Sequence, residues 1–263
     1  SLQAAREFIE EHSARAPGQT ALVRTLMEKT EPVPAPRLLE EAGTGRSSLN
    51  ALEKKEIISL HRGPVSADTG PREEILPTRP LDLNREQQKA LDEIRDRIEK
   101  ETFGVFLFHG ITGSGKTEVY MRAIAEVLDR GKQAIVLVPE ISLTPQIGER
   151  FIGRFGRRVA IIHSAQSEGE RYASWKAIAA GEAAIVLGPR SAVFTPVKNL
   201  GMIVVDEEHE SSYKQYSQAP FYHARDVAVM RAKLSGAPAV LGSATPSLES
   251  YYNYRQGKYS LLH

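Results

Sequence analysis

The sequence predicts an α/β protein in which a small winged-helix domain precedes a phosphate-loop domain with a mainly parallel sheet. Two observations predict the larger domain. From about residue 83 onward short apolar runs alternate with helical patterns, and a glycine-rich loop follows one of these runs. A third observation separates the domains, because Pro71, Pro77 and Pro80 each remove a backbone donor and discourage helix before them. We therefore expect a winged-helix domain and linker over residues 1–80 and the larger domain over residues 81–263.

The winged-helix prediction starts from two short helical patterns across a glycine-containing turn in residues 38–54, which is typical of helix-turn-helix. Residues 57–62 and 72–76 are the expected strands of the wing. The second helix displays Arg46 and Lys54, which can reach base edges or phosphates of DNA. The alternative is that this module braces a neighbouring domain or binds protein, because acidic residues stand beside the lysine.

In the larger domain, apolar runs rich in strand-forming residues are the expected strands. Near-continuous apolar strands separated by helices are typical of a parallel sheet with helices on both faces. Some of these helices are expected to end at glycines such as Gly131 and Gly181. In such sheets ligands bind beyond the carboxyl ends of the strands. The expected strands are residues 105–108, 134–138, 159–162, 184–187, 202–205 and 239–241.

Composition restricts the class of protein. With 41% apolar and 25% charged residues, the 263-residue chain has the composition of an ordinary soluble globular protein. The absence of cysteine excludes disulfides and thiolate metal sites and fits a cytosolic protein, and the seven scattered histidines predict no structural metal. A net charge of +1 means that nucleic-acid binding must come from local clusters. The first residue is Ser1, so we expect a processed product or a fragment, and a monomer without a membrane span.

The glycine-rich loop reads GITGSGKT over residues 110–117, between the apolar run 105–108 and an amphipathic helical segment. Strand, glycine-rich loop and helix together predict a phosphate site, because backbone N–H groups of the curled loop point at one phosphate. Lys116 is expected to contact the β- and γ-phosphates, and the Thr117 hydroxyl to hold Mg²⁺. A glycine-rich loop without a nucleotide is the alternative. The predicted nucleotide-binding residues of the loop are Gly110, Thr112, Gly113, Ser114, Gly115, Lys116 and Thr117.

A second group of candidate residues stands where the apolar run 202–205 leads directly into Asp206-Glu207-Glu208-His209. Asp206 is expected to hold Mg²⁺, usually through water, and Glu207 to orient and deprotonate an attacking water. An acidic, solvated strand–loop junction is the alternative, and the phosphate loop in the same module argues against it. Lys116, Asp206 and Glu207 are therefore the predicted catalytic residues.

The motif DEEH at 206–209, together with GSAT at 242–245, resembles the motifs of superfamily 2 helicases and translocases. Further segments narrow the similarity to the PriA family of replication-restart helicases (primosomal protein N′). The similarity runs in order from about Leu83 to the end of the chain, and the stretch from SSYKQ to YHARD is its most specific part. The matching segments are VLVPEISLTPQ at 136–146, HSAQSEGERY at 163–172, GPRSAVFTP at 188–196, DEEHESSYKQ at 206–215, YHARDVA at 222–228 and GSATPSLES at 242–250.

The resemblance implies roles on the nucleotide side of the domain. Gln87 corresponds to the residue that recognises adenine in these helicases, although Asn84 and Gln87 also have the spacing of a helix capping box. His209, Ser243 and Thr245 are expected to couple the nucleotide site to the rest of the motor, with a plain helix-capping histidine as the alternative to a relay by His209.

On the DNA side, the resemblance implies that Arg190 and Ser191 hold the single-strand backbone. The family more usually has Thr than Pro at position 189, which removes one hydroxyl contact. In the aromatic-rich loop from Ser211 to His223, Tyr213 and Tyr216 around Lys214 are expected to stack on unpaired bases.

For the whole protein, the resemblance implies an ATP-dependent 3′→5′ DNA helicase that acts in restart of stalled replication forks, with this chain as its winged-helix domain and first RecA-like lobe. ATP and Mg²⁺ are the implied cofactors, and zinc is expected only in a part of the family that this chain lacks. Implied partners are forked and single-stranded DNA, single-stranded-DNA-binding protein and other primosome proteins, in the bacterial cytoplasm at the nucleoid.

A second lobe supplies the arginine finger in such motors, so we expect weak ATP binding and poor hydrolysis by this part alone. The alternatives are a duplex-DNA translocase of a restriction or remodelling system, and a nucleotide-binding docking module without motor activity of its own.

Overall fold

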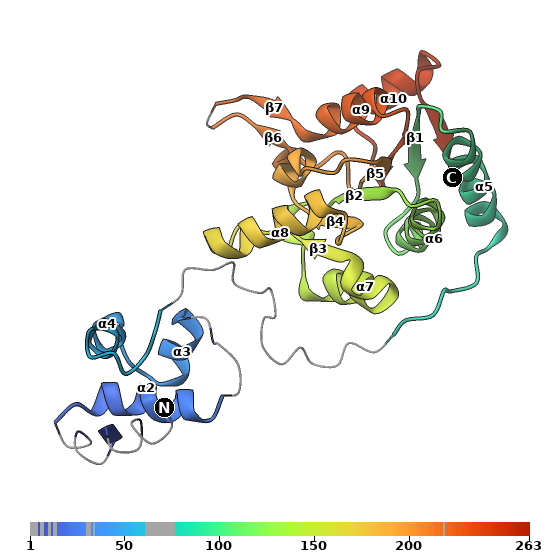
Figure 1. Cartoon of the computed structure of the whole chain (residues 1–263). Helices are drawn as coiled ribbons and strands as arrows, with labels where there is room; N and C mark the ends of the chain where they lie inside the picture. Colours follow the sequence, from blue (N-terminus) through green and yellow to red (C-terminus); the bar gives the residue numbers. More distant parts are fainter. Residues whose placement is uncertain are drawn as a thin grey trace. The chain divides into compact units, whose positions relative to one another are not determined.

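A computed structural model describes residues 77–217 and 219–263 of the larger part, and 15–29, 35–60 and residues 5, 8, 9, 12 and 33 of the N-terminal part. The chain divides into two compact units, Ser1–Val65 and Ser66–His263, each of which is described by itself (Figure 1). None of the described helices is long and apolar enough to cross a bilayer.

The small unit is helical over its described residues. Helices α2 (Pro17–Met27), α3 (Ala35–Glu41) and α4 (Arg46–Lys54) surround one apolar cluster. The fixed φ of proline suits the first position of α2, and Gly43, with φ of +61°, permits the sharp turn between α3 and α4. The buried residues of this cluster are Phe8, Leu22, Val23, Leu38, Leu49 and Leu52.

The wing is the part of the N-terminal prediction that the structure does not reproduce where it can be compared. Residues 57–60 form a bend and an irregular segment in place of the first expected strand. The remainder of the expected ribbon, residues 61, 62 and 72–76, lies outside the described residues. Helices α3 and α4 lie on either side of the glycine-containing turn, as expected, and the winged-helix assignment stays a prediction.

The large unit contains a seven-stranded parallel sheet in the order β3-β4-β2-β5-β8-β1-β9 (Figure 1). The α/β class and each expected strand are confirmed, while β9 and a small antiparallel ribbon of β6 and β7 were not predicted. The strands are β1 (Gly104–His109), β2 (Gln133–Leu137), β3 (Val159–Ile161), β4 (Ile185–Gly188), β5 (Leu200–Val205), β6 (Lys214–Gln215), β7 (Tyr222–His223), β8 (Pro238–Ser243) and β9 (Ser260–Leu262).

Helices cover both faces of the sheet, so alternate side chains of one strand enter two different cores. Phe106 and Phe108 pack with α5, α6 and α7, whereas Val105 and Leu107 pack with α8 and α9. Every residue of β5 and β8 is buried, as expected for central parallel strands. The helices are α5 (Arg85–Lys100), α6 (Lys116–Asp129), α7 (Pro145–Phe155), α8 (Glu168–Ala180), α9 (Ala224–Leu234) and α10 (Leu248–Arg255), with short 3₁₀ helices η1 (Glu140–Ser142), η2 (Gly156–Arg158), η3 (Arg190–Phe194) and η4 (Ser211–Tyr213).

Candidate active site

The glycine-rich loop connects the carboxyl end of β1 to the first residue of α6, as its sequence predicts. Gly113 and Gly115 have φ values of +80° and +85°, a left-handed conformation that glycine adopts without strain. A Cβ atom at Gly115 would also overlap the Gln87 amide. The Gly110 N–H donates to the Ser243 carbonyl at 3.1 Å, so the loop is fixed to the end of β8. The loop therefore has a curled backbone that leads into a helix N-terminus.

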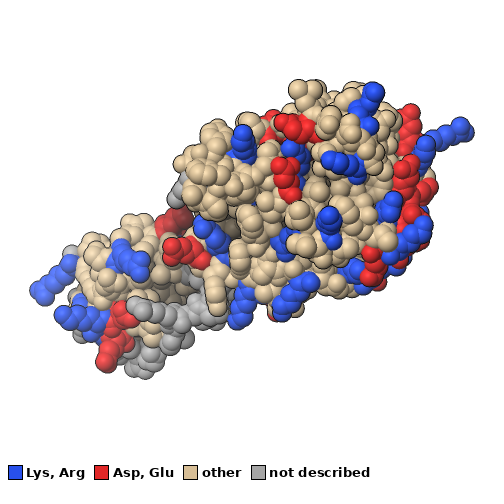
Figure 2. Space-filling model, turned by 90° about the horizontal axis from the view of Figure 1, so that it is seen from above, with Lys and Arg blue, Asp and Glu red and all other residues tan. Residues whose placement is uncertain are grey.

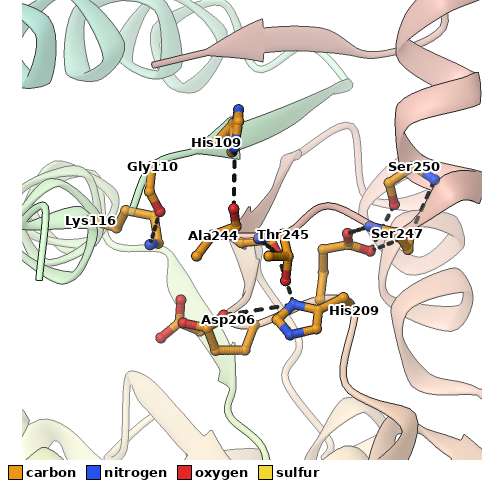
Figure 3. A network of polar contacts seen from close by, with 12 residues as sticks. His109, Gly110, Lys116, Asp206, His209, Ala244, Thr245, Ser247 and Ser250 are labelled. Atoms are coloured by element: carbon orange, nitrogen blue, oxygen red, sulfur yellow. Dashed lines mark hydrogen bonds and ion pairs between the residues drawn. The ribbon is translucent and has the colours of Figure 1, made fainter. Parts of the chain in front are cut away.

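Lys116 lies inside this loop and is only 7% exposed. Its Nζ donates to the carbonyl of Gly110 at 2.6 Å (Figure 3) and to that of Ile111 at 3.3 Å. Thr117 follows in the first turn of α6 and is half-buried. The ammonium group and the helix N-terminus are donors that suit an anion, so the residues present fit the phosphates of a nucleotide.

Gln87 takes part in a capping box and also reaches the glycine-rich loop. The Asn84 side chain accepts from the Gln87 N–H, and the Gln87 side chain accepts from the Asn84 N–H, both at 2.8 Å. The Gln87 Nε2 donates to the Ser114 carbonyl at 2.7 Å. The predicted capping box is thus present, and it places the Gln87 amide beside the phosphate loop.

Asp206 follows the last residue of β5 and is held through its backbone and its side chain. Its N–H donates to the Leu137 carbonyl at 2.9 Å, and its carboxylate accepts from the Tyr120 hydroxyl at 3.2 Å. Burial, followed by the neighbouring charge of Glu207, raises the pKa of Asp206 to about 6, while Lys116 and the Tyr120 hydrogen bond act in the opposite direction. A carboxylate that is costly to ionise when alone suits a cation as its partner.

Glu207 and His209 continue from Asp206 toward the loop after β8. Glu207 has φ of +47°, and its Oε2 lies 3.7 Å from His209 Nδ1. The same His209 nitrogen forms a 2.7 Å hydrogen bond with Ser243 Oγ, which accepts the Thr245 N–H at 3.0 Å (Figure 3). The three residues predicted to couple the site are therefore in one hydrogen-bonded chain beside Glu207.

Arg190 and the aromatic-rich loop lie next to one another. Arg190 Nη1 donates to the carbonyls of Ser212 at 3.2 Å and Lys214 at 3.4 Å, so this arginine fixes the start of the β6–β7 ribbon. Ser191 and Lys214 are exposed, and Tyr216 is 71% exposed. In the small unit, Arg46 and Lys54 are exposed on α4, whose Leu49 and Leu52 are buried.

The expected stacking role of Tyr213 is wrong for this structure. Its side chain is completely buried in the core beneath the ribbon, and its hydroxyl donates to the Asp206 carbonyl at 2.6 Å. A ring in this position cannot receive a base. Tyr213 instead connects the start of the ribbon to Asp206.

The protein family that matches this chain covers the elements that form the nucleotide side of the site. The DEAD/DEAH box helicase family matches residues 84–253, which include α5, the phosphate loop and the DEEH segment. The chain belongs to the DEAD/DEAH box helicase family. In its DEEH segment, this chain has Glu208 at the third position, where both forms of the family name have Ala.

Relatives within this helicase family agree with the predicted similarity to PriA, which is confirmed. Replication restart protein PriA of Bacillus subtilis (strain 168) is 47% identical over 252 residues, covering 95% of this chain and 31% of that protein. PriA of Chlamydia pneumoniae is 44% identical over 259 residues, covering 97% of this chain and 34% of that protein. The chain thus spans about a third of the length of these curated relatives. The UvsW helicase from bacteriophage T4 aligns with a TM-score of 0.48 at 15% identity, covering 94% of this chain and 78% of that structure.

One buried residue of the helicase motif was missed by the reasoning from sequence. Glu208 is completely buried and bonds to Arg225 and to Ser247 and Ser250. All of these residues lie in segments that carry the resemblance, but spacing gave no sign that they meet. The sequence did contain a signal for this contact. The Arg in YHARD and the acid in DEEH are charged, and charges inside a buried α/β core have to be paired.

Proposed function

We propose that this chain is the winged-helix domain and ATP-binding lobe of a PriA-type, ATP-dependent 3′→5′ DNA helicase that restarts stalled replication forks. The observation that carries the proposal is the placement of Lys116 and Asp206 at the carboxyl edge of one parallel sheet, close enough for the lysine charge to lower the pKa of the carboxylate. Phosphate and cation chemistry need these two charges in one place.

The roles of the residues follow from their chemistry. When bound, ATP with Mg²⁺ supplies the phosphoryl group and the positive charge that neutralises it. Lys116 and the loop N–H groups bind the phosphates, and Thr117 and Asp206 hold the cation. Glu207 takes the proton of the attacking water, and Gln87, already beside the loop, recognises adenine. The chain His209–Ser243–Thr245 transmits the state of this site to neighbouring segments.

DNA binding is assigned to groups outside the nucleotide site, all of them exposed except the half-buried Arg190. Arg190 and Ser191 hold a single-strand backbone, Lys214 and Tyr216 on the ribbon contact unpaired nucleotides, and Arg46 and Lys54 contact duplex. On the face shown in Figure 2, Lys and Arg side chains are interspersed with Asp and Glu, which supports binding through local clusters rather than one basic field. Forked DNA, single-stranded-DNA-binding protein and primosome proteins in the bacterial cytoplasm are the proposed partners, and zinc is assigned to other parts of the protein.

The test is steady-state ATP hydrolysis by the complete protein with forked DNA, blunt duplex or no DNA, beside Lys116→Ala and Glu207→Gln. We expect strong stimulation by forked DNA, its loss in both variants, and retained nucleotide binding in Glu207→Gln, because Lys116 contacts phosphate in the ground state and Glu207 does not. Equal stimulation by blunt duplex would favour a duplex translocase. A rate of hydrolysis that is the same with and without DNA would refute the restart proposal and favour a nucleotide-dependent docking module.

A further inference from the structure

Glu208 is a completely buried carboxylate whose two oxygens are both engaged. Oε2 accepts from Arg225 Nη1 at 3.1 Å, Ser247 Oγ at 2.9 Å and Ser250 Oγ at 2.8 Å. Oε1 accepts from the Ser247 N–H at 2.7 Å. Because burying a charge is costly unless it is paired and hydrogen-bonded, this set of partners stabilises one orientation of the carboxylate. We call Glu208, Arg225, Ser247 and Ser250 the Glu208 cluster.

The Glu208 cluster joins three segments that are far apart in the chain. Glu208 lies three residues beyond β5, Arg225 lies in the first turn of α9 directly after β7, and the serines begin α10. Arg225 Nη1 also donates to Ser247 Oγ at 2.7 Å. That oxygen caps α10 by accepting the Ser250 N–H at 3.2 Å (Figure 3). The Glu208 N–H donates to the Gly242 carbonyl at 2.9 Å, which adds the end of β8.

The position of Glu208 in the chain connects this cluster to the residues proposed to act in ATP hydrolysis. Its two neighbours are Glu207, the proposed base, and His209, which bonds Ser243. Successive residues share peptide planes, so a fixed Glu208 side chain and N–H restrict where both neighbours can lie. A small alanine at this position, as in the family name, has no side chain that could make these contacts.

We propose that Glu208 is a positioning residue for ATP hydrolysis. By holding the DEEH segment on the start of α10, it sets the direction of the Glu207 carboxylate and the contact of His209 with Ser243. The inference rests on the proposed function, because it assigns Glu207 as the base of that reaction. It predicts that weakening the cluster lowers the rate of hydrolysis without changing nucleotide affinity, since Lys116 and its loop do not contact the cluster.

Glu208→Gln is the sharpest variant, because glutamine has nearly the shape of glutamate but cannot satisfy this site. Its NH₂ group must replace either Oε2, where it meets the Arg225 guanidinium, or Oε1, where it meets the Ser247 N–H. Both partners are donors only, so either orientation places donors against each other. Asp226→Asn is the matched control. The exposed Asp226 carboxylate pairs with the same Arg225, through Nε at 3.0 Å, and lies outside the cluster.

The experiment measures kcat and KM for DNA-stimulated ATP hydrolysis by the complete protein, together with Tm and the Kd of a fluorescent ADP analogue. We expect Glu208→Gln to lower kcat by about 10- to 100-fold, the size of effect that a small misplacement of a reacting group produces. KM and Kd should stay within about twofold of the parent protein, a change that corresponds to well under one kcal/mol. Asp226→Asn should behave as the parent.

A second variant keeps the inference testable if Glu208→Gln does not fold. Ser250→Ala removes one hydroxyl donor from Oε2 and leaves the other partners in place, so a smaller drop in kcat at constant Kd is expected. Unchanged kcat in a folded Glu208→Gln protein would overturn the inference alone, and so would kcat and Kd that worsen together with Tm. A parent protein with no DNA-stimulated hydrolysis would instead overturn the proposed function, and the inference with it.

Discussion

Asp206 is a carboxylate that the fold buries. Its pKa of about 6 lies above the ordinary value of 3.8, with burial as the first cause and Glu207 as the second. A raised pKa means that the folded chain holds this proton more tightly than the unfolded chain. Ionisation of Asp206 therefore destabilises the fold. The effect is absent below about pH 4 and complete above about pH 6. It amounts to about 3 kcal/mol, because the folded and unfolded pKa values differ by about two pH units.

Replacement of Asp206 by Asn should remove this destabilisation. We expect Asp206→Asn to be more stable than the parent chain by about 1–3 kcal/mol at pH 8, with the difference fading as the pH falls toward 4. Unfolding in denaturant with EDTA present, repeated across this pH range, measures the effect. Asp226→Asn, at an exposed carboxylate, is the control and should show no such trend. A parent chain that is more stable than Asp206→Asn at pH 8 would contradict the assignment.

At the scale of single residues, the sequence predicted the charged groups of the site better than their surroundings. Lys116, Asp206 and Glu207 follow from the order of strand, loop and helix, which local pattern predicts. Tyr213 was misjudged because a tyrosine in a loop looks exposed, and only the fold reveals the core beneath it. Its hydroxyl donates a hydrogen bond to the Asp206 carbonyl, which is why this polar aromatic residue is stable in a buried position.

At the scale of elements, the strands that the sequence could predict are those that form continuous apolar runs. These strands, including the three-residue β3, were predicted within about two residues. By contrast, β6 and β7 have two residues each, too few for any periodicity to appear, and β9 begins with the exposed polar Ser260. Their pairing depends on β1 and on each other, partners that are distant in the chain. The helix-turn-helix was predictable because its turn requires glycine.

The β6–β7 ribbon has a buried base and an exposed end, so its aromatic residues should differ in function. Tyr213 anchors the base, whereas Tyr216 is 71% exposed beyond β6. We expect Tyr216→Ala to weaken binding of single-stranded DNA by about 5- to 150-fold, the range for loss of one stacked base, and to leave hydrolysis without DNA unchanged. Fluorescence anisotropy with a labelled oligonucleotide measures the affinity.

The control for the ribbon is Tyr172→Ala, at a tyrosine of α8 that is 65% exposed. It removes the same surface from another element and should leave DNA affinity unchanged. If both variants bind DNA equally well, the ribbon is not a stacking surface. If Tyr216→Ala also loses hydrolysis without DNA, its effect passes through the site rather than through DNA.

At the scale of the whole molecule, the chain has two units, each with its own core residues. The small unit buries its own apolar cluster, and the large unit buries two around its sheet. Residues 78–81 bind the large unit through backbone groups. The Thr78 N–H donates to Gly153, the Leu81 N–H to the Glu118 carboxylate, and Arg154 Nη2 to the Arg79 carbonyl. The sequence predicted a linker up to residue 80, but not that Thr78 and Arg79 contact α7.

Two truncated chains separate the contribution of the small unit from that of residues 78–81. A chain of residues 77–263 keeps the large unit and these backbone contacts, so we expect its Tm and nucleotide Kd to equal those of the large unit in the full chain. A chain of residues 82–263 lacks the contacts to Gly153, Arg154 and Glu118, and its Tm should fall by roughly 3–10 °C, at about 2–4 °C for each kcal/mol lost. Glu118 directly follows Thr117, so the loss should also weaken nucleotide binding. Differential scanning calorimetry and nucleotide titration check both outcomes.

Equal melting of the two truncations would mean that the segment is a passive linker. Failure of 77–263 to fold would mean that the small unit is required for the larger core.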